Sequence, residues 1–290
     1  MRIIPGEIKT ALLHGYLLGA VAPRPICFAS TIDSNGVSNL SPFSFFNVFG
    51  AKPPILIFSP ARRVRDNTVK HTLENVYATS EVVINVVNYN MVQQTNLASC
   101  EYPKGVDEFV KAGFTPIPSD IVKPFRVKES PVQLECRVLK VLETGTEGGA
   151  GNLVICEVVC MHIDDAVLDA EGKIDPNKID LVARMGGDHY CRAYGSAIFD
   201  VPKPNAALGI GIDALPQAVR NSTILTGNHL GILGNSTAIP PKEAAHDKRI
   251  NGILDLYKND PVARTEGLHR YAKALIETGD VEKAWQALLA

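Results

Sequence analysis

A succession of short apolar or alternating segments between Pro25 and Asp200 constrains this chain more than any other feature. Each segment is bounded by glycine, proline, asparagine or aspartate, which is typical of β-strands rather than helices. Strands without covered edges invite unwanted pairing, and closing the sheet into a barrel removes those edges. We therefore expect a mainly β (α+β) fold built around a barrel, with the clearest strands at Ile26–Ile32, Ile55–Ser59, Glu81–Val87, Val132–Leu142 and Leu153–Ile163.

Two turn sequences predict antiparallel neighbours. The turn sequence Asp33-Ser34-Asn35-Gly36 follows the first predicted strand, and its Asn-Gly dipeptide favours the positive φ angles of a tight hairpin. The glycine-rich stretch Glu143–Asn152 separates the two longest predicted strands, which indicates a second hairpin. Helices are expected at Asp66–Glu74, with Asp66 or Asn67 as the N-cap, and at Val106–Ala112.

The composition changes after Pro202 and Pro204, where alanine, leucine, lysine and glutamate increase. We place a domain boundary there, giving domains 1–204 and 205–290, the second an α-helical extension. Its expected helices are Pro241–Asn259, Pro261–Thr278 and Val281–Leu289. The last two resemble one tetratricopeptide hairpin, with Ala272 and Ala284 where the helices touch. A single such hairpin cannot bury its own faces, so it should pack on the barrel or across a dimer.

The composition excludes several classes of protein. A formal net charge of −2 over 290 residues gives no basic surface for nucleic acid. The six cysteines include no CxxC pair, so we expect reduced thiols. Cys156 and Cys160 have the spacing of metal ligands on a helix, but their neighbours are β-branched and predict a strand, so no metal ligand is expected.

The apolar segment Ala11–Ala22 resembles a secretory signal, but His14 interrupts it and twelve residues cannot span a bilayer. We expect a buried opening segment in a cytoplasmic protein with no membrane partner.

Three motifs could contribute to chemistry. In Asn39–Asn47, polar side chains alternate with phenylalanines around Pro42, as at the border of a binding site; an irregular edge strand would explain this pattern equally well. In Ser59–Arg65, three arginines end a predicted strand before a predicted helix start, with Lys70 and Thr72 close behind. This arrangement favours anion binding, although a solvated basic loop is the commoner meaning of such a run.

The third motif is Arg184–Tyr190, in which the adjacent glycines Gly186 and Gly187 would let the backbone approach a ligand closely. A plain turn is the alternative. The chain lacks the GxGxxG, GxxxxGK[ST], HExxH and GxSxG motifs, so dinucleotide-fold, P-loop, zincin and hydrolase functions have no support.

Taken together, APRPICFAST, the Asn-Gly turn, NLSPFSFFN, FSPARR, KHTLEN and RMGGDHY resemble, in order and spacing, the flavin reductase-like, FMN-binding split-barrel family, which includes flavoredoxin-type proteins. The resemblance extends from about Leu12 to Asp200. It implies a six-stranded antiparallel Greek-key barrel, a homodimer, and flavin mononucleotide (FMN) in a groove near the subunit interface.

The resemblance also implies a set of cofactor-binding residues. The isoalloxazine ring and ribityl chain would contact Ser30, Thr31, Asn39, Ser41, Phe43 and Ser44. The phosphate would be held by Ser59, Arg62, Lys70 and Thr72, and the site would be closed by Arg184 and Tyr190.

The implied activity is an FMN oxidoreductase in which NADH or NADPH reduces bound flavin and an acceptor takes the electrons. No catalytic side chain is expected, because the cofactor performs the chemistry. Two alternatives are a flavin reductase that supplies free reduced flavin to a monooxygenase and an electron-transfer flavoprotein fed by a protein partner. A barrel that binds another flat ligand, such as pyridoxal phosphate or haem, is a further alternative.

Overall fold

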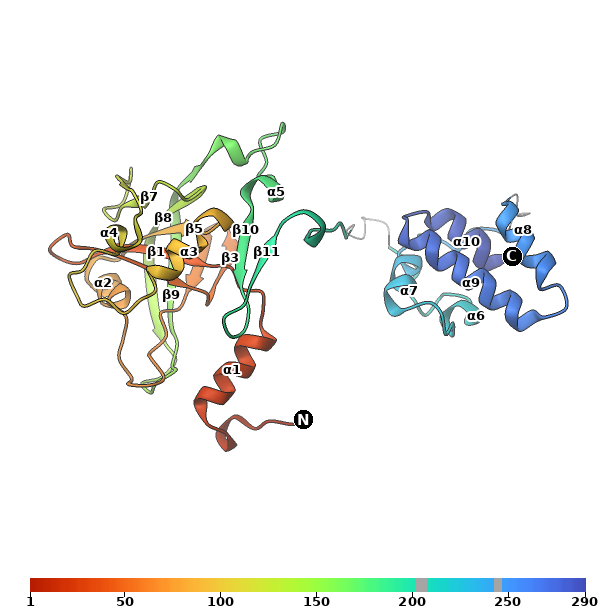
Figure 1. Ribbon diagram of the computed structural model, residues 1–290, viewed down its shortest axis with the longest axis horizontal. Coiled ribbons are helices and arrows are strands. Elements are labelled where there is room, and N and C mark those ends of the chain that lie inside the picture. Colours follow the sequence, from red (N-terminus) through yellow and green to blue (C-terminus); the bar gives the residue numbers. More distant parts are fainter. Residues whose placement is uncertain (202–207, 243–246) are drawn as a thin grey trace. The chain divides into compact units, whose positions relative to one another are not determined.

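The computed structural model describes residues 1–201, 208–242 and 247–290, and internal contacts divide the chain into two compact units, Met1–Phe199 and Asp200–Ala290 (Figure 1). The boundary expected at Pro202–Pro204 lies outside the described residues. Within the described ranges, no helix is long and apolar enough to cross a membrane.

The first unit is built on one seven-stranded sheet in which every neighbouring pair is antiparallel. Its order is β2-β1-β5-β8-β9-β4-β3. The strands are β1 (Cys27–Ile32), β2 (Ser38–Phe43), β3 (Phe46–Ala51), β4 (Pro54–Phe58), β5 (Glu81–Val86), β8 (Val132–Glu143) and β9 (Asn152–Ile163). The two expected hairpins are present as β1–β2 and β8–β9.

The two edge strands of this sheet are consecutive in the sequence. β2 ends at Phe43 and β3 begins at Phe46, yet they stand at opposite ends of the strand order. Three residue steps span no more than about 11 Å, so the two edges must approach each other. The sheet therefore curls into a barrel, as expected, but with seven strands rather than six, because the Asn39–Asn47 motif divides into two strands.

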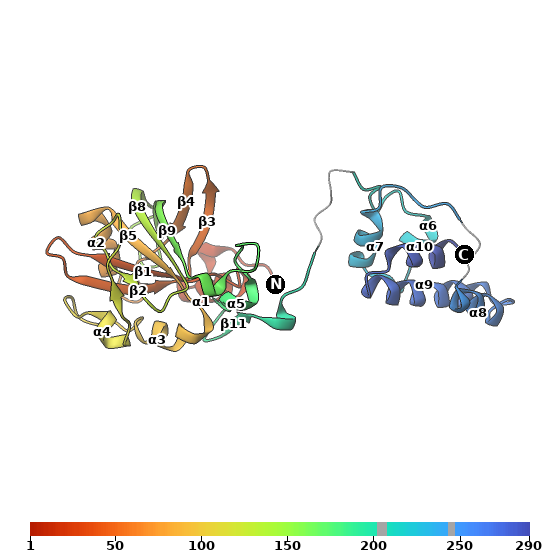
Figure 2. The same ribbon diagram turned by 90° about the horizontal axis from the view of Figure 1, so that it is seen from above.

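Two small sheets and short helices complete the first unit (Figure 2). The small sheets pair β6 (Pro116–Ile117) with β7 (Arg126–Val127), and β10 (Leu181–Arg184) with β11 (Tyr190–Ala193). The helices are α1 (Thr10–Ala20), α2 (His71–Thr79), α3 (Val92–Leu97), α4 (Glu108–Ala112) and α5 (Pro176–Ile179), with 3-10 turns at Pro5–Glu7, Tyr89–Met91, Asp165–Val167 and Gly195–Ala197.

α2 begins five residues after the expected N-cap at Asp66. The Asp66 carboxylate accepts hydrogen bonds from the Thr68 amide and hydroxyl, and Asn67 has a φ of 58°. These features form a turn rather than a helix start. An aspartate side chain can bond to the backbone two residues on in either structure, so the residue type alone does not distinguish them. The helix expected at Asp66–Glu74 was therefore placed too early, and Lys70 is the N-cap instead.

The expectation of a buried opening segment was wrong. The segment forms α1, and none of its residues is buried. Leu12 and Leu17 are 51% and 52% exposed. The helix has apolar side chains around most of its circumference, and a single chain covers only part of that surface.

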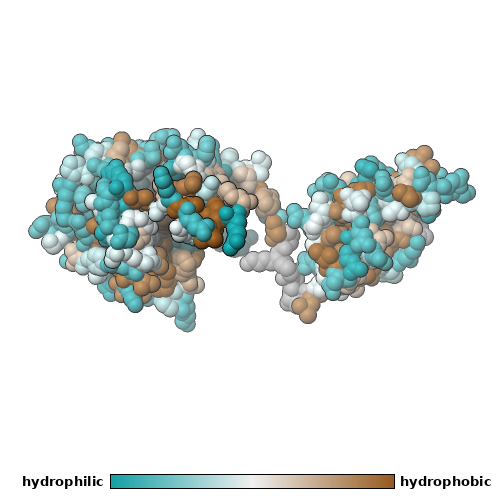
Figure 3. All heavy atoms as spheres, turned by 90° about the horizontal axis from the view of Figure 1, so that it is seen from below, coloured by the Kyte–Doolittle hydropathy of each residue, from teal (hydrophilic) through white to brown (hydrophobic). Residues whose placement is uncertain are grey.

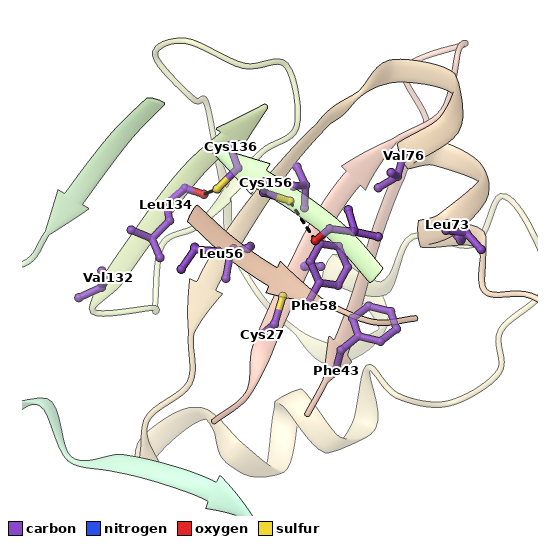
Figure 4. Close-up of a cluster of buried hydrophobic side chains, with 14 of the residues drawn as sticks. Cys27, Phe43, Leu56, Phe58, Leu73, Val76, Val132, Leu134, Cys136 and Cys156 are labelled. Carbon is purple, nitrogen blue, oxygen red and sulfur yellow. Dashed lines mark hydrogen bonds between the residues drawn. The ribbon is translucent and has the colours of Figure 1, made fainter. Parts of the chain in front are cut away.

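Both faces of β1 are buried, which explains why its six residues form an unbroken buried run. Cys27 and Ala29 belong to the barrel interior with Phe43, Phe58 and other apolar residues (Figure 4). Phe28 points to the opposite face and joins a second apolar cluster with residues of α3, α4 and their connections. Side chains alternate along a strand, so one strand serves two cores.

The second unit is helical, with α6 (Gln217–Arg220), α7 (Gly227–Gly234), α8 (Lys248–Leu256), α9 (Pro261–Glu277) and α10 (Val281–Leu289). Part of the helix expected at Pro241–Asn259 lies outside the described residues. Ala272 and Ala284 are fully buried between helices as expected. The α9–α10 hairpin, however, is covered by residues of its own unit, including Leu215, Leu233 and Ile250, rather than needing the barrel or a dimer.

Candidate functional site

A cavity of about 150 Å³ opens beside the end of β2. It brings together four of the residues expected to bind a cofactor, Phe43, Ser44, Arg184 and Tyr190. The other lining residues are Ile26, Pro42, Val92, Thr95, Asn96 and Ser99. We call this space the first cavity.

A second cavity of about 350 Å³ adjoins it and shares four lining residues, Val92, Asn96, Arg184 and Tyr190. Its other walls include Tyr89, Gln93, Asp188 and Arg192. The Arg192 guanidinium lies 3.9 Å from the centre of the Tyr89 ring and pairs with the Asp180 carboxylate at 2.7 Å. Two neighbouring spaces of this kind have room for two ligands.

The β10–β11 hairpin positions Arg184 and Tyr190 directly opposite each other. The guanidinium carbon of Arg184 lies 4.7 Å from the centre of the Tyr190 ring, which is a cation–π contact. The turn between them carries Gly186, where a Cβ atom would come within 3.1 Å of the Gly19 Cα of α1. Close approach is therefore required here as expected, but it is to α1.

Arg24 supports this hairpin and was not singled out from the sequence. Its backbone exchanges hydrogen bonds with Arg184, at 2.9 and 2.8 Å. Its guanidinium donates to the carbonyls of Leu18 at 2.7 Å, Met185 at 3.0 Å and Val21, and its Nε lies 3.4 Å from Ser44 Oγ. Burial, followed by repulsion from Arg184, lowers the pKa of Arg24. The signal in the sequence was a charged residue between two prolines.

α3 contributes polar groups that the sequence analysis also missed. Thr95 lines the first cavity, and its hydroxyl is buried and has no hydrogen-bond partner within the described residues. An unpaired buried hydroxyl costs free energy unless a ligand or water satisfies it. Asn96, next in sequence, lines both cavities. The first cavity thus combines apolar walls with polar side chains, one of them unsatisfied, which is the pattern of a small-molecule site.

Two of the residues expected to hold a phosphate, Ser59 and Arg62, already have hydrogen-bond partners within the chain. The Ser59 hydroxyl accepts a hydrogen bond from the Asn152 amide at 3.0 Å. The Arg62 guanidinium donates to the Asn67 side chain at 2.6 Å and to its carbonyl at 2.9 Å. Lys70, by contrast, has no hydrogen-bond partner for its ammonium among the residues that the structure describes. Burial, followed by repulsion from Arg63, lowers the pKa of Lys70. An anion would relieve both effects.

The turn between β8 and β9 fixes the shape of this arginine segment. The Gly149 amide donates to the Arg62 carbonyl at 3.0 Å, and the Arg62 amide donates to the Ala150 carbonyl at 2.9 Å. A Cβ atom at Gly148 would come within 2.9 Å of the Arg63 carbonyl oxygen. Glycine is therefore needed where the two segments meet.

Asn39 and Thr72 belong to a buried network. The Thr72 hydroxyl donates to Asn39 Oδ1 at 2.7 Å, and Asn39 Nδ2 donates to both Glu108 oxygens at 3.1 Å. The Leu40 amide donates to the same carboxylate at 3.0 Å. Burial raises the pKa of Glu108. No sequence motif pointed to Glu108, because its partners are 68 and 69 residues away.

The three remaining expected residues lie within the strands β1 and β2. Ser30, Thr31 and Ser41 are all buried, and the Thr31 hydroxyl accepts from Asn75 Nδ2 at 3.1 Å. The Ser30 hydroxyl is unpaired within the described residues. The structure thus brings Phe43, Ser44, Arg184 and Tyr190 around one cavity, and joins Asn39 to Thr72 in a network that does not line it.

The chain is similar to proteins of known sequence and structure. It is 36% identical over 195 residues to an uncharacterized protein of Aquifex aeolicus, covering 67% of this chain and 97% of that protein. Its structure resembles nitrilotriacetate monooxygenase component B from Bacillus cereus, at 27% identity and a TM-score of 0.64, covering 69% and 98% of the two chains. It also resembles a protein with a split barrel domain from Shewanella frigidimarina, at 28% identity and a TM-score of 0.58, covering 68% and 94%.

The family model described as the flavin reductase like domain matches residues 19–178. This range contains the whole seven-stranded sheet and the residues of β2 and α3 that line the first cavity. The β10–β11 hairpin, which carries Arg184 and Tyr190, follows it. The order of the motifs, the curled antiparallel sheet and the match over more than half of the chain agree, and the protein belongs to the flavin reductase-like family of split-barrel flavoproteins.

Proposed function

We propose that this protein is an FMN oxidoreductase in which NADH or NADPH reduces the bound flavin and the electrons pass to a further acceptor. The observation that carries the proposal is the pair of neighbouring cavities between β2, α3 and the β10–β11 hairpin. One space suits the flavin ring, and the adjoining space suits a second flat molecule against it. Membership of the flavin reductase-like family supports the same reaction class.

The first cavity fits the chemistry of an isoalloxazine ring. Such a ring has two apolar faces and a polar rim, and the walls offer Phe43 and Pro42 beside Ser44 and the unpaired Thr95 hydroxyl. In this proposal Ser44 and Thr95 bond to the rim, while Arg184 and Tyr190 cover the opening. The role of Ser30, Thr31, Asn39 and Ser41 is to shape the strands behind the ring.

The phosphate would be held by Lys70, with Arg62, Ser59 and Thr72 near it. Lys70 is the residue best suited to this role, because its ammonium is partly buried and makes no hydrogen bond or salt bridge to a described side chain, although Glu101 and Glu108 attract it at longer range. A dianionic phosphate would accept its charge-assisted hydrogen bond. Arg62 would have to exchange its bonds to Asn67 for the phosphate.

FMN supplies the hydride chemistry when bound, so the protein needs no side chain as acid or base. The protein's own residues orient the flavin and shield it. The cation–π pair Arg184–Tyr190 fixes one wall, and Arg24 holds that wall to α1 and to Ser44. Aligning two flat reactants in contact accounts for a large part of the rate of such a step.

A homodimer is part of the proposal. Hydrophobic side chains reach the surface of the molecule (Figure 3), and in the first unit they include Leu12 and Leu17 of α1 and Val48 and Phe49 of β3, the last two 64% and 63% exposed. Large contiguous apolar patches at a protein surface mark contacts with other proteins. A second copy of the chain would cover them.

The similarity to component B of a monooxygenase supports the second candidate, a flavin reductase that releases reduced flavin to a partner oxygenase. An electron carrier fed by a protein donor is the third. The three differ in how tightly flavin is held and in whether a nicotinamide reduces it.

An anaerobic absorbance titration of the purified protein with FMN, then NADH, then NADPH, tests the proposal. Bleaching of protein-bound flavin supports the oxidoreductase and identifies its donor. A bound flavin that stays oxidised supports the protein-fed carrier. No binding of flavin refutes all three candidates.

Lys70→Ala tests the phosphate site separately. It should weaken FMN by about 1.5–3 kcal/mol, or roughly 10- to 150-fold, and leave riboflavin affinity unchanged, because riboflavin lacks the phosphate. Lys104→Ala is the matched control, since Lys104 is an exposed lysine paired with Glu74 at 2.6 Å. Equal loss of both ligands in Lys70→Ala would remove this residue from the phosphate site.

A further inference from the structure

Four side chains with metal-binding atoms meet on the outside of the β8–β9 hairpin. Their ligand atoms all lie within 4.8 Å of one another, and they belong to Asp120, Glu135, Cys160 and His162. None of the four lines either cavity of the candidate site. We propose that they form a binding site for a divalent cation of the zinc class, independent of the flavin.

A β-bulge creates this cluster. Glu135 pairs with Cys160 and Cys136 pairs with Val158, so Val159 has no partner across the ladder. An extra residue of this kind reverses the alternation of side chains beyond it. Cys156 points into the barrel interior (Figure 4), and regular alternation would send Cys160 there too. The bulge turns Cys160 and His162 to the other face, beside Glu135.

The separations suit a tetrahedral ion. Cys160 Sγ and His162 Nε2 lie 3.5 Å apart. Ligands at about 2.3 Å for sulfur and 2.0 Å for nitrogen are about 3.5 Å apart across a tetrahedral angle. His162 Nε2 and Glu135 Oε1 lie 2.7 Å apart, within hydrogen-bond distance, and both could bind one ion after a small outward movement of the histidine.

Backbone amides hold the Glu135 carboxylate in place, as groups behind a metal ligand commonly do. Its two oxygens accept hydrogen bonds from the amides of Asp120, Ile121 and Val122 at 2.7–3.0 Å. Ligating carboxylates are commonly fixed in this way. The same bonds bring the Asp120 side chain to the cluster, where it supplies the fourth ligand. Mixed sulfur, nitrogen and oxygen donors favour zinc over magnesium or calcium, which prefer oxygen.

The test uses the full-length protein, treated with a chelator and then equilibrated with Zn²⁺ alone. Plasma emission spectrometry should find one zinc per chain after dialysis. Cys160→Ser should weaken zinc binding by more than the 10- to 100-fold that loss of an outer-shell partner costs. Asp120→Asn, at an exposed position, should weaken it less. Cys100→Ser, an exposed thiol elsewhere, is the control and should keep full binding.

A second readout needs no variant. Bound zinc should slow the alkylation of Cys160 by iodoacetamide, followed by peptide mass spectrometry, and leave that of Cys100 unchanged. Unchanged alkylation of Cys160, or no zinc retained by the wild-type protein, would refute the site and leave Glu135 only a structural role, holding the loop at Asp120–Val122 through its amides. Neither outcome depends on flavin binding, so the two proposals fail separately.

Discussion

The two units of the chain bury different kinds of side chain. Among the described residues, 15 of the buried polar or charged side chains belong to the first unit and two, His229 and His269, to the second. Both histidines have nearby partners, His229 in the capping box with Thr226 and His269 with the Ser222 hydroxyl at 2.8 Å. Burying polar groups is costly unless each finds a partner. Buried polar groups are therefore concentrated in the first unit, whereas the core of the second unit is mainly apolar.

The largest expected effect is a loss of stability confined to one of the two cores. Phe58→Ala in the barrel and Trp285→Ala in the helical unit each remove a large buried side chain. Phe58 is 0% exposed and Trp285 is 2% exposed. Each should cost about 3–5 kcal/mol of stability in its own unit. Differential scanning calorimetry should show two transitions, with Phe58→Ala lowering one and Trp285→Ala the other.

Val262→Ala, at a side chain that is 71% exposed in the second unit, serves as the control and should move neither transition. A single transition lowered by both core variants would contradict the comparison, because it would show that the units unfold together.

Glu108→Gln examines the polar network of the first unit. The new amide places a donor against Asn39 Nδ2, so it should cost about 1–3 kcal/mol. Burial raises the pKa of Glu108 above its ordinary value of 4.5, so the folded state binds its proton more tightly than the unfolded state does. The stability that this proton contributes is present below pH 4.5 and is lost as the pH rises through the raised pKa.

The advantage of the wild type over Glu108→Gln should therefore shrink as the pH rises from 4.5 to 7, measured by urea unfolding. Glu129→Gln is the comparison, since Glu129 also accepts a backbone amide, that of Thr115 at 3.1 Å, but at an exposed position. A wild-type advantage that grows with pH would mean that Glu108 is stabilised as a carboxylate.

The smallest effect is expected from removing the second unit. A chain that ends at Val201 keeps the cavity, Lys70 and the buried network, all of which lie in Met1–Phe199. Its dissociation constant for FMN, measured by fluorescence quenching, should stay within about twofold of the full chain's. A tenfold loss would assign part of the flavin site to the helices.

Much of the fold could be predicted because its signals are local. The alternation in β8 and β9 and the capped helices α9 and α10 fixed their limits to within a residue or so. The start of α2 could not be predicted, since aspartate at position 66 suits both an N-cap and a turn, and only the positive φ of Asn67 decides. The exposure of α1 was missed because apolar composition alone does not show whether a segment packs against the rest of its own chain.

The site could be predicted where its residues are close in sequence. Arg184 and Tyr190 flank one hairpin, and Phe43 and Ser44 are adjacent, so their motifs were visible. Arg24, Thr95 and Glu108 were not, because their importance arises from packing between elements far apart in the chain. Arg24 reaches Met185 across 161 residues, and no spacing rule covers such a distance.

The glycine-rich turn at the end of the β8–β9 hairpin has a consequence for anyone who engineers this protein. Turns at hairpin tips usually tolerate insertions, tags and sequence drift. Here Gly148, Gly149 and the Ala150 carbonyl hold the tip against the arginine segment through close contacts and hydrogen bonds. The tip therefore fixes the conformation of that segment. A peptide inserted at this tip should disturb the arginine segment while leaving the hairpin itself paired, and the tip is therefore a poor place for a label.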